Sequence, residues 1–171
     1  MVVALNTEAS MPGTQAAFEK TLTSLPPVLA GANIVIGGAT LDSGNTYSFE
    51  QLVIDDEICS GMTRIARGFN VDDETLALDI IEDVGIGGHY LESRHTVRHV
   101  STDHWYPMLY KRIKRTEPSW NLDLMGHHDL AGTAKAKAND ILANHKPEPL
   151  EKEIEKKIRA IVAKAERCSM R

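Results

Sequence analysis

The sequence predicts an α/β fold of two βα units followed only by helices, as expected at the C-terminal end of a larger α/β protein. The first sign is a pair of short apolar runs, residues 2–5 and 33–38, rich in β-branched side chains. The second is that each run leads through a polar loop into a helical pattern, which is the order of a βα unit. The third is length, because 171 residues fall short of the roughly 200 that a closed (β/α)8 barrel needs.

The first unit is expected to run strand, loop, helix, strand. Residues 2–5 predict a short buried strand, and Thr14 is expected to cap the helix that follows the loop. Pro26 and Pro27 are expected to interrupt this helix, since proline lacks the amide donor and clashes with the preceding turn. Residues 33–38 then predict a fully buried parallel strand with a right-handed crossover to the first strand.

The second unit continues with a loop and a long helix. The loop is expected over residues 39–47, and Ser48 is expected to cap the helix, with Gln51 at the capping-box position. Apolar spacing carries the helix from Phe49 to about residue 67, and Gly68 ends it. This helix should be mostly buried.

Only helices and irregular segments are expected after residue 70. Residues 89–126 look irregular apart from one short helix near 96–100. The expected domains are residues 1–126, the last βα units with a helical extension, and residues 127–171, the C-terminal helices. The other expected helices are one capped by Asp72 that ends near residue 84, one capped by Asp129 that ends near residue 144, and an amphipathic one from about residue 150 to 165.

Two strands cannot close a sheet, because buried parallel strands need neighbours on both edges. Three explanations stay open at this point. The missing strands come from another chain, or the chain is a piece of a larger protein, or its strands are exposed.

Charge and composition exclude several classes of protein. The chain carries 19 Lys and Arg against 24 Asp and Glu, a net charge of −5, which argues against binding of a nucleic-acid backbone. No stretch reaches the roughly 18 apolar residues of a membrane-spanning helix, and the first residues lack the pattern of a signal peptide. Cys59 and Cys168 suit reduced thiols, so we expect a cytoplasmic protein with neither nucleic-acid nor membrane partners.

Ligands of parallel α/β proteins bind at the C-terminal ends of the strands, and two polar loops have that position here. Glu8 and Asp42 are the only acids in these loops before the second helix begins, and a cationic substrate would need such a carboxylate. Ser43 and Thr46 are candidates beside them. The alternative is that all four are ordinary turn and cap residues.

Three consecutive acids, Asp55, Asp56 and Glu57, stand in the middle of the long helix. Consecutive helical residues point in widely different directions, so an apolar helix cannot leave all three in solvent. At least one should be partly buried and hydrogen-bonded, or should face a partner. The alternative is a solvated helix face.

The histidines do not form a recognised metal motif. His95 and His99 are spaced as a metal pair on one helix face, but no Glu follows His95 as HExxH requires, and both cysteines are remote. We therefore assign no metal site and expect structural or mouth-lining histidines. Residues 85–88, GIGG, lack the spacing and the preceding strand of a dinucleotide site.

Five blocks of sequence, in order and correctly spaced, resemble the trimethylamine methyltransferase family. Together they extend over nearly the whole chain. The blocks are GTQAAFEK (13–20), SFEQLVIDDEI (48–58), GFNVDDETLALD (68–79), VGIGGHYL (84–91) and ILANH leading into PEPL (141–150).

The resemblance implies that the chain is the C-terminal part of a TIM (β/α)8 barrel, about two βα units, followed by C-terminal helices. Members of the family move a methyl group from a tertiary or quaternary amine, glycine betaine among them, to the cobalt of a corrinoid. A separate small protein carries that corrinoid, so no cofactor would be bound directly. The expected setting is methylamine-dependent methanogenesis or related one-carbon metabolism. The alternative is a non-catalytic remnant or assembly module that pairs with another chain.

The front of the barrel and the pyrrolysine of the trimethylamine branch do not occur in this chain. Because an amber codon encodes pyrrolysine, the chain is expected to be a downstream piece, completed by the missing barrel half or by another chain. The resemblance assigns no catalytic residue. It implies that a corrinoid protein docks over the mouth of the barrel, and the candidates to face it are Gly37, Gly38, Glu50, Gly88 and His89.

Overall fold

The computed structural model describes residues 1–109 and 130–169, and the chain divides into two compact units, Met1–Asn139 and Asp140–Arg171. Helix α6 begins in the first unit and ends in the second, which also contains α7. In chain order the described elements are β1 (Val2–Val3), α1 (Thr14–Leu29), β2 (Val35–Ile36), β3 (Thr40–Leu41), η1 (Asp42–Gly44), β4 (Thr46–Tyr47), α2 (Phe49–Arg67), α3 (Asp73–Leu76), α4 (Leu78–Val84), α5 (Arg94–Thr102), α6 (Leu130–Asn144) and α7 (Lys152–Ser169).

The predicted parallel βα unit is present in the first compact unit. Strand β1 pairs with β2 in parallel, with Val2 opposite Val35 and Val3 opposite Ile36, and α1 connects the two strands. The prediction that these strands are fully buried is wrong, because Val3 is 67% exposed and Ile36 is 44% exposed. A pair of strands leaves two open edges, and within the described residues it forms a separate two-stranded sheet.

A short hairpin occupies the predicted loop of residues 39–47. Strands β3 and β4 pair antiparallel, with Thr40 opposite Tyr47 and Leu41 opposite Thr46. Strands of two residues are too short for an alternating pattern to reveal them, so the sequence suggested only a loop.

Helix α1 differs from its prediction at both ends. Thr14 lies inside the helix, and Gly13 occupies the N-cap position without a side-chain bond. The helix also continues through Pro26 and Pro27 to Leu29. Both prolines stand in the last two turns, and the carbonyls that lose their helical donor belong to the exposed residues Leu22 and Thr23, where water can replace it.

The predicted bounds of α2 are confirmed, but the prediction that the helix is mostly buried is wrong, since only five of its 19 residues are buried. The Ser48 hydroxyl accepts a hydrogen bond from the Gln51 amide at 3.2 Å, and Gly68 ends the helix with φ 64°. Of the helices expected later, the one near residues 96–100 is confirmed as α5. The one after Asp72 is capped as expected but divides into α3 and α4, because Ala77 takes a left-handed conformation.

The C-terminal helices match the sequence pattern where they are described. Helix α6 ends at Asn144 as predicted, but its expected cap Asp129 and the expected domain boundary at 126/127 lie outside the described residues. Helix α7 is the final amphipathic helix, with exposed Ile154 and Ile158 and an ion pair between Arg159 and Glu155 at 2.7 Å. Within the described residues, no helix combines the length and apolar character needed to cross a membrane.

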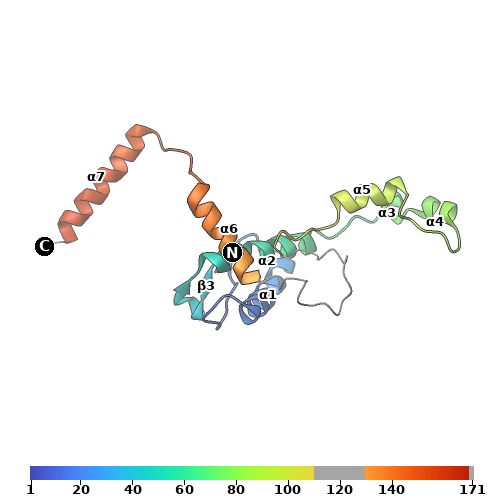
Figure 1. The fold of residues 1–171 in the computed structure, drawn as a ribbon, viewed down its shortest axis with the longest axis horizontal. Helices are drawn as coiled ribbons and strands as arrows, with labels where there is room; N and C mark the ends of the chain where they lie inside the picture. Colours follow the sequence, from blue (N-terminus) through green and yellow to red (C-terminus); the bar gives the residue numbers. More distant parts are fainter. Residues whose placement is uncertain (110–129, 170–171) are drawn as a thin grey trace. The chain divides into compact units, whose positions relative to one another are not determined.

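A buried ion pair joins α1 to α2, which lie against each other (Figure 1). Lys20 Nζ donates to Asp55 Oδ2 at 2.8 Å, and the two side chains are 0% and 2% exposed. Asp55 also accepts from Gln51 Nε2 at 2.7 Å and from the Ala39 amide at 2.7 Å. Three donors around one carboxylate offset much of the cost of removing it from water.

A second buried acid, Glu57, connects α2 to the segment that contains Leu109. Glu57 Oε1 accepts a hydrogen bond from the amide of Leu109 at 3.0 Å, whereas Asp56 is exposed. The prediction that at least one acid of the triplet is buried and hydrogen-bonded is therefore confirmed. Apolar packing surrounds the contact, with Ile54 of α2, Leu109 and Ala134 of α6 in one cluster.

We expect Asp55→Ala to lower the free energy of unfolding by roughly 3–5 kcal/mol, because it leaves the Lys20 ammonium buried without its counter-charge. The matched control is Asp56→Ala, one residue away but exposed, which should stay within about 0.5 kcal/mol of the parent. Denaturant unfolding of the full chain, followed by circular dichroism, measures both. Equal stability of the two variants would show that the buried pair does not hold α1 on α2.

The backbone amides of β1 and β2 should exchange with solvent much faster than those of the middle of α2, because the two-stranded pair has open edges. Hydrogen exchange of the monomeric chain, followed by NMR or mass spectrometry, measures the difference. Protection of β1 and β2 equal to that of α2 would mean that further backbone pairs with these strands.

Candidate functional site

The backbone turns sharply just after each parallel strand, and a buried side chain holds each turn. Leu5 follows β1 with φ 57°, and its amide donates to Ser24 Oγ of α1 at 2.7 Å. Ala39 follows β2 with φ 67°, and its amide donates to Asp55 Oδ2 of α2 at 2.7 Å. Left-handed conformations are costly for residues with a side chain and gather at functional sites, so the C-terminal edge of the strand pair is the candidate site.

Gly37 allows the two strand ends to approach each other. Its φ is +123°, and a Cβ placed on it would lie 2.0 Å from the carbonyl oxygen of Ala4. Lys20 Nζ also lies 3.3 Å from the Gly37 carbonyl oxygen, so the ammonium contacts both Asp55 and this turn. These contacts give Gly37 a packing role, and its predicted role toward a partner stays a prediction.

Two backbone hydrogen bonds join the loops that follow the strands. The Ser43 amide donates to the Thr7 carbonyl at 2.9 Å, and the Asp42 amide donates to the Ala9 carbonyl at 2.9 Å. Asp42 and Ser43 are themselves left-handed, with φ 50° and 52°. Together with Leu5 and Ala39, four strained residues with side chains thus occur in two loops that are joined to each other.

Glu19 of α1 holds the first loop, and sequence reasoning missed it because the residue looks like an ordinary exposed helical acid. Its Oε2 accepts from the Thr7 hydroxyl at 2.6 Å and from the Glu8 amide at 2.9 Å, while Oε1 accepts from Gln15 at 2.9 Å. These bonds, with Thr7 the largest contribution, hold the pKa of the Glu19 carboxyl below its ordinary value. The carboxylate therefore stays charged and keeps the loop in place.

The four predicted substrate-binding residues lie on these joined loops and on the hairpin. Glu8 stands between Thr7 and Ala9, and the carbonyls of these two neighbours accept hydrogen bonds from the second loop. The backbone of Glu8 therefore lies near Asp42 and Ser43, although the sequence separates them. Thr46 begins β4, opposite Leu41. All four side chains are exposed, and none forms a hydrogen bond with the described residues, so the two carboxylates are available to a cationic ligand.

Of the other predicted residues, Gly38 lies at this edge between Gly37 and Ala39, whereas Glu50 lies in the first turn of α2 and Gly88 and His89 follow α4. Glu50 accepts from the Ser48 hydroxyl at 2.7 Å, and this bond is the main reason that the pKa of its carboxyl lies below the usual value. Gly38 faces Leu52, since a Cβ added to the glycine would lie 3.7 Å from the leucine side chain. Gly88 packs against the Val84 carbonyl after α4, and His89 follows it. Their roles toward a partner stay predictions.

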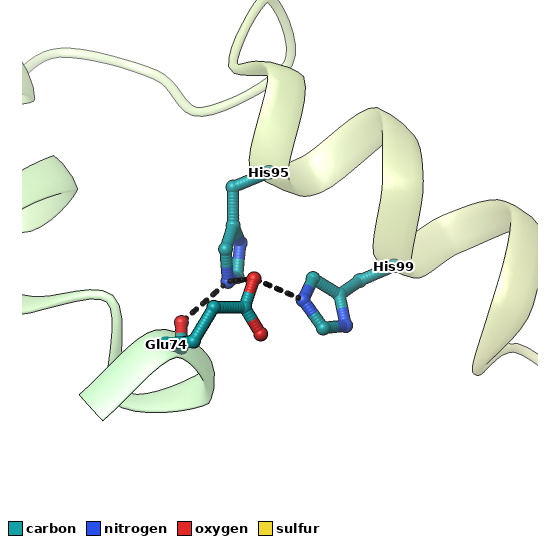
Figure 2. A group of neighbouring side chains, drawn as sticks. All are labelled: Glu74, His95 and His99. Carbon is teal, nitrogen blue, oxygen red and sulfur yellow. Dashed lines mark hydrogen bonds and ion pairs between the residues drawn. The ribbon is translucent and has the colours of Figure 1, made fainter. Parts of the chain in front are cut away.

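A second group of polar side chains lies outside this edge, where α5 meets α3. His95 and His99 come from α5, and Figure 2 shows both rings turned toward the carboxylate of Glu74. Glu74 Oε1 lies 3.1 Å from His99 Nε2 and 3.6 Å from His95 Nε2. Motif spacing missed this cluster because its acid stands 21 residues before His95 rather than beside it.

Comparisons with known proteins bear on the whole chain. A family profile described as trimethylamine methyltransferase (MTTB) matches residues 3–169. The trimethylamine methyltransferase MttB2 of Methanosarcina mazei is 41% identical over 170 residues, which are 98% of this chain and 33% of the relative. MttB of Methanosarcina barkeri is 40% identical over 164 residues, 94% of this chain and 32% of the relative.

A more distant relative has a different named substrate. The glycine betaine methyltransferase of Desulfitobacterium hafniense is 31% identical over 150 residues, 87% of this chain and 30% of the relative. The chain thus spans about a third of the length of the curated relatives that it matches. Because the family profile extends over nearly every residue, the chain belongs to the trimethylamine methyltransferase family.

Proposed function

We propose that this chain forms part of a methyltransferase that moves a methyl group from trimethylamine, or a related tertiary or quaternary amine, to the cobalt of a corrinoid protein. The observation that carries the proposal is the family match over residues 3–169. Relatives named for trimethylamine and for glycine betaine support a substrate that carries several methyl groups on one nitrogen. The reaction belongs to methylamine-dependent methanogenesis or related one-carbon metabolism and takes place in the cytoplasm, in keeping with two free cysteines.

We infer that the parallel pair of β1 and β2 is part of a TIM-type barrel. The support is the parallel pairing itself and the exposed apolar side chains of Val3, Ile34 and Ile36, which further strands or helices would cover. In such a barrel the C-terminal ends of the strands form the mouth, where the substrate binds. The loops joined through Asp42 and Ser43 follow those ends in this chain.

Methyl transfer to cobalt needs no general base. It needs a positioned ammonium group, removal of water around the methyl carbon, and an open path for the acceptor. The corrinoid supplies the cobalt that accepts the methyl group. The carboxylates of Glu8 and Asp42 offset the positive charge of the amine, and Ser43 and Thr46 lie on the same segment as Asp42.

The acceptor protein docks over the same mouth in this proposal. The candidates to face it are Gly37, Gly38, Glu50, Gly88 and His89. The glycines among them carry no side chain, so they would let the acceptor approach the backbone closely.

A second candidate function is that of an assembly module without catalysis of its own. The observation that favours it is the exposed apolar face of the strand pair, because such a face is suited to pairing with another chain. Methyl transfer by the complete protein decides between the two. A complex that assembles through this chain and yet methylates no corrinoid with any methylated amine would support the module.

We expect Glu8→Gln and Asp42→Asn each to raise KM for the amine by about tenfold, equivalent to about 1.4 kcal/mol of lost attraction, while kcat changes little. The experiment follows methylation of the corrinoid by absorption spectroscopy in the complete enzyme that contains this chain. The matched control is Asp56→Asn, which removes an exposed acid from α2 and should leave KM unchanged.

Different results would contradict the assignment of the site residues and the proposed function. An unchanged KM in both variants, with a fully active parent, would remove Glu8 and Asp42 from the site. Absence of methyl transfer in the parent with trimethylamine and glycine betaine would contradict the function itself.

A further inference from the structure

We propose that Glu74, His95 and His99 bind a divalent transition-metal ion, with Zn²⁺ the best match, at the contact between α3 and α5. The proposal goes beyond the methyl-transfer site, because none of these residues belongs to the loops after β1 and β2. Two imidazoles and one carboxylate are a common ligand set for Zn²⁺, and they leave a fourth position open.

The separations between the ligand atoms suit a tetrahedral ion. Zinc–nitrogen and zinc–oxygen bonds of about 2.0–2.2 Å place neighbouring ligands of a tetrahedron about 3.3 Å apart. Glu74 Oε1 lies 3.1 Å from His99 Nε2 and 3.6 Å from His95 Nε2, and all three ligand atoms lie within 4.8 Å of one another. Small shifts of side chains would complete the site.

Both histidines present their rings on one face of α5, next to Glu74. They stand four residues apart on α5, so their rings lie on one helix face, with ring centroids 4.2 Å apart. The two side chains are only partly exposed, at 21% and 24%. Figure 2 shows the two rings on the same side of the helix, facing the acid of α3.

Asp103 provides the second observation that points to a metal. Its Oδ2 contacts His99 Nδ1, the ring nitrogen that faces away from Glu74. Metal-binding histidines usually donate their other N–H to a carboxylate in this way, which fixes the tautomer and makes the ligating nitrogen more basic. In that tautomer His99 would present its Nε2 lone pair toward Glu74.

Charge in the cluster is balanced by groups that a metal would displace. The guanidinium of Arg98 contacts Glu74 Oε1, and His95 Nε2 lies 2.9 Å from the Glu74 carbonyl oxygen. Arg98 is 58% exposed and can move into solvent, leaving the carboxylates of Glu74 and Asp103 to balance the two charges of the ion. Metal binding replaces the His95 hydrogen bond and displaces its proton.

The fourth coordination position of the ion would face a cavity rather than the protein interior. A cavity of about 540 Å³ is lined by all three ligand residues, together with Arg64 and Asp103. Water or a small anion would occupy the fourth position there. Bound metal would also fasten the four-residue helix α3 to α5, which strengthens a short element that packing alone holds weakly.

The experiment titrates the purified full chain, freed of metal by a chelator, with Zn²⁺ by calorimetry and with Co²⁺ by visible absorption. We expect one ion per chain and, with Co²⁺, the intense visible bands of a tetrahedral site. His95→Ala, His99→Ala and Glu74→Gln should each weaken binding at least about tenfold. Asp103→Asn should weaken it by about tenfold to a hundredfold without removing a ligand.

The effect of Arg98→Ala distinguishes a metal site from a network of ion pairs alone. Because the variant removes the cation that competes for Glu74, it should tighten Zn²⁺ binding several-fold. Circular dichroism of each variant shows whether α5 remains folded. If the histidine variants lose helix, the Arg98→Ala and Asp103→Asn results still decide the proposal.

The control variants are His104→Ala and the double variant His127→Ala/His128→Ala, both of which should bind Zn²⁺ as the parent does. The proposal is overturned if the parent binds no Zn²⁺ at millimolar concentration. It is equally overturned if binding is lost in the double control variant and kept in His95→Ala and His99→Ala.

Discussion

The carboxylate of Asp55 joins three parts of the chain at one buried point. Lys20 reaches it from α1, Gln51 from the preceding turn of α2, and the Ala39 amide from the loop after β2. A charge this deeply buried is tolerated only while its partners remain, since the loss of one leaves an uncompensated charge in an apolar surrounding. The position of the second loop relative to both helices therefore depends on this network.

Helix α1 supplies the matching contacts for the first loop. Lys20 and Ser24 lie one turn apart on its buried side and reach the ends of β2 and β1, while Glu19 holds Thr7 and Glu8. The strands themselves have only two residues each and cannot position long loops. Within the first compact unit, the geometry of the candidate site comes from polar side chains of the helices rather than from the sheet.

The helices were predictable where local signals are strong, and the loops were not. Ser48 and Gly68 bound α2 because a cap and a stop each act within one turn. The burial of Asp55 followed from its place in an apolar helix, but its partners Lys20 and Ala39 are 35 and 16 residues away in sequence. Local patterns do not report contacts of that range, and for the same reason the role of Glu19 and the acid of the histidine cluster were missed.

Errors of prediction have equally specific causes. Pro26 and Pro27 did not end α1. They stand near its C-terminal end, and the carbonyls four residues earlier, which lose their helical donor, belong to exposed residues. The strands were expected to be buried because a continuous β-branched run is typical of a buried parallel strand. Within the described residues β1 and β2 have no further neighbouring strand, so Val3 and Ile36 stay exposed.

The pairing of Ser43 with Thr7 and of Asp42 with Ala9 constrains how the two loops can vary among homologues. Backbone hydrogen bonds join the two loops, so the conformation of each depends on the other. If one loop alone were replaced by that of a homologue, its backbone amides or carbonyls could lose their hydrogen-bond partners in the other loop. The two loops would then be inherited as a matched pair of segments, and recombination between them would be more disruptive than substitution of any exposed side chain on either.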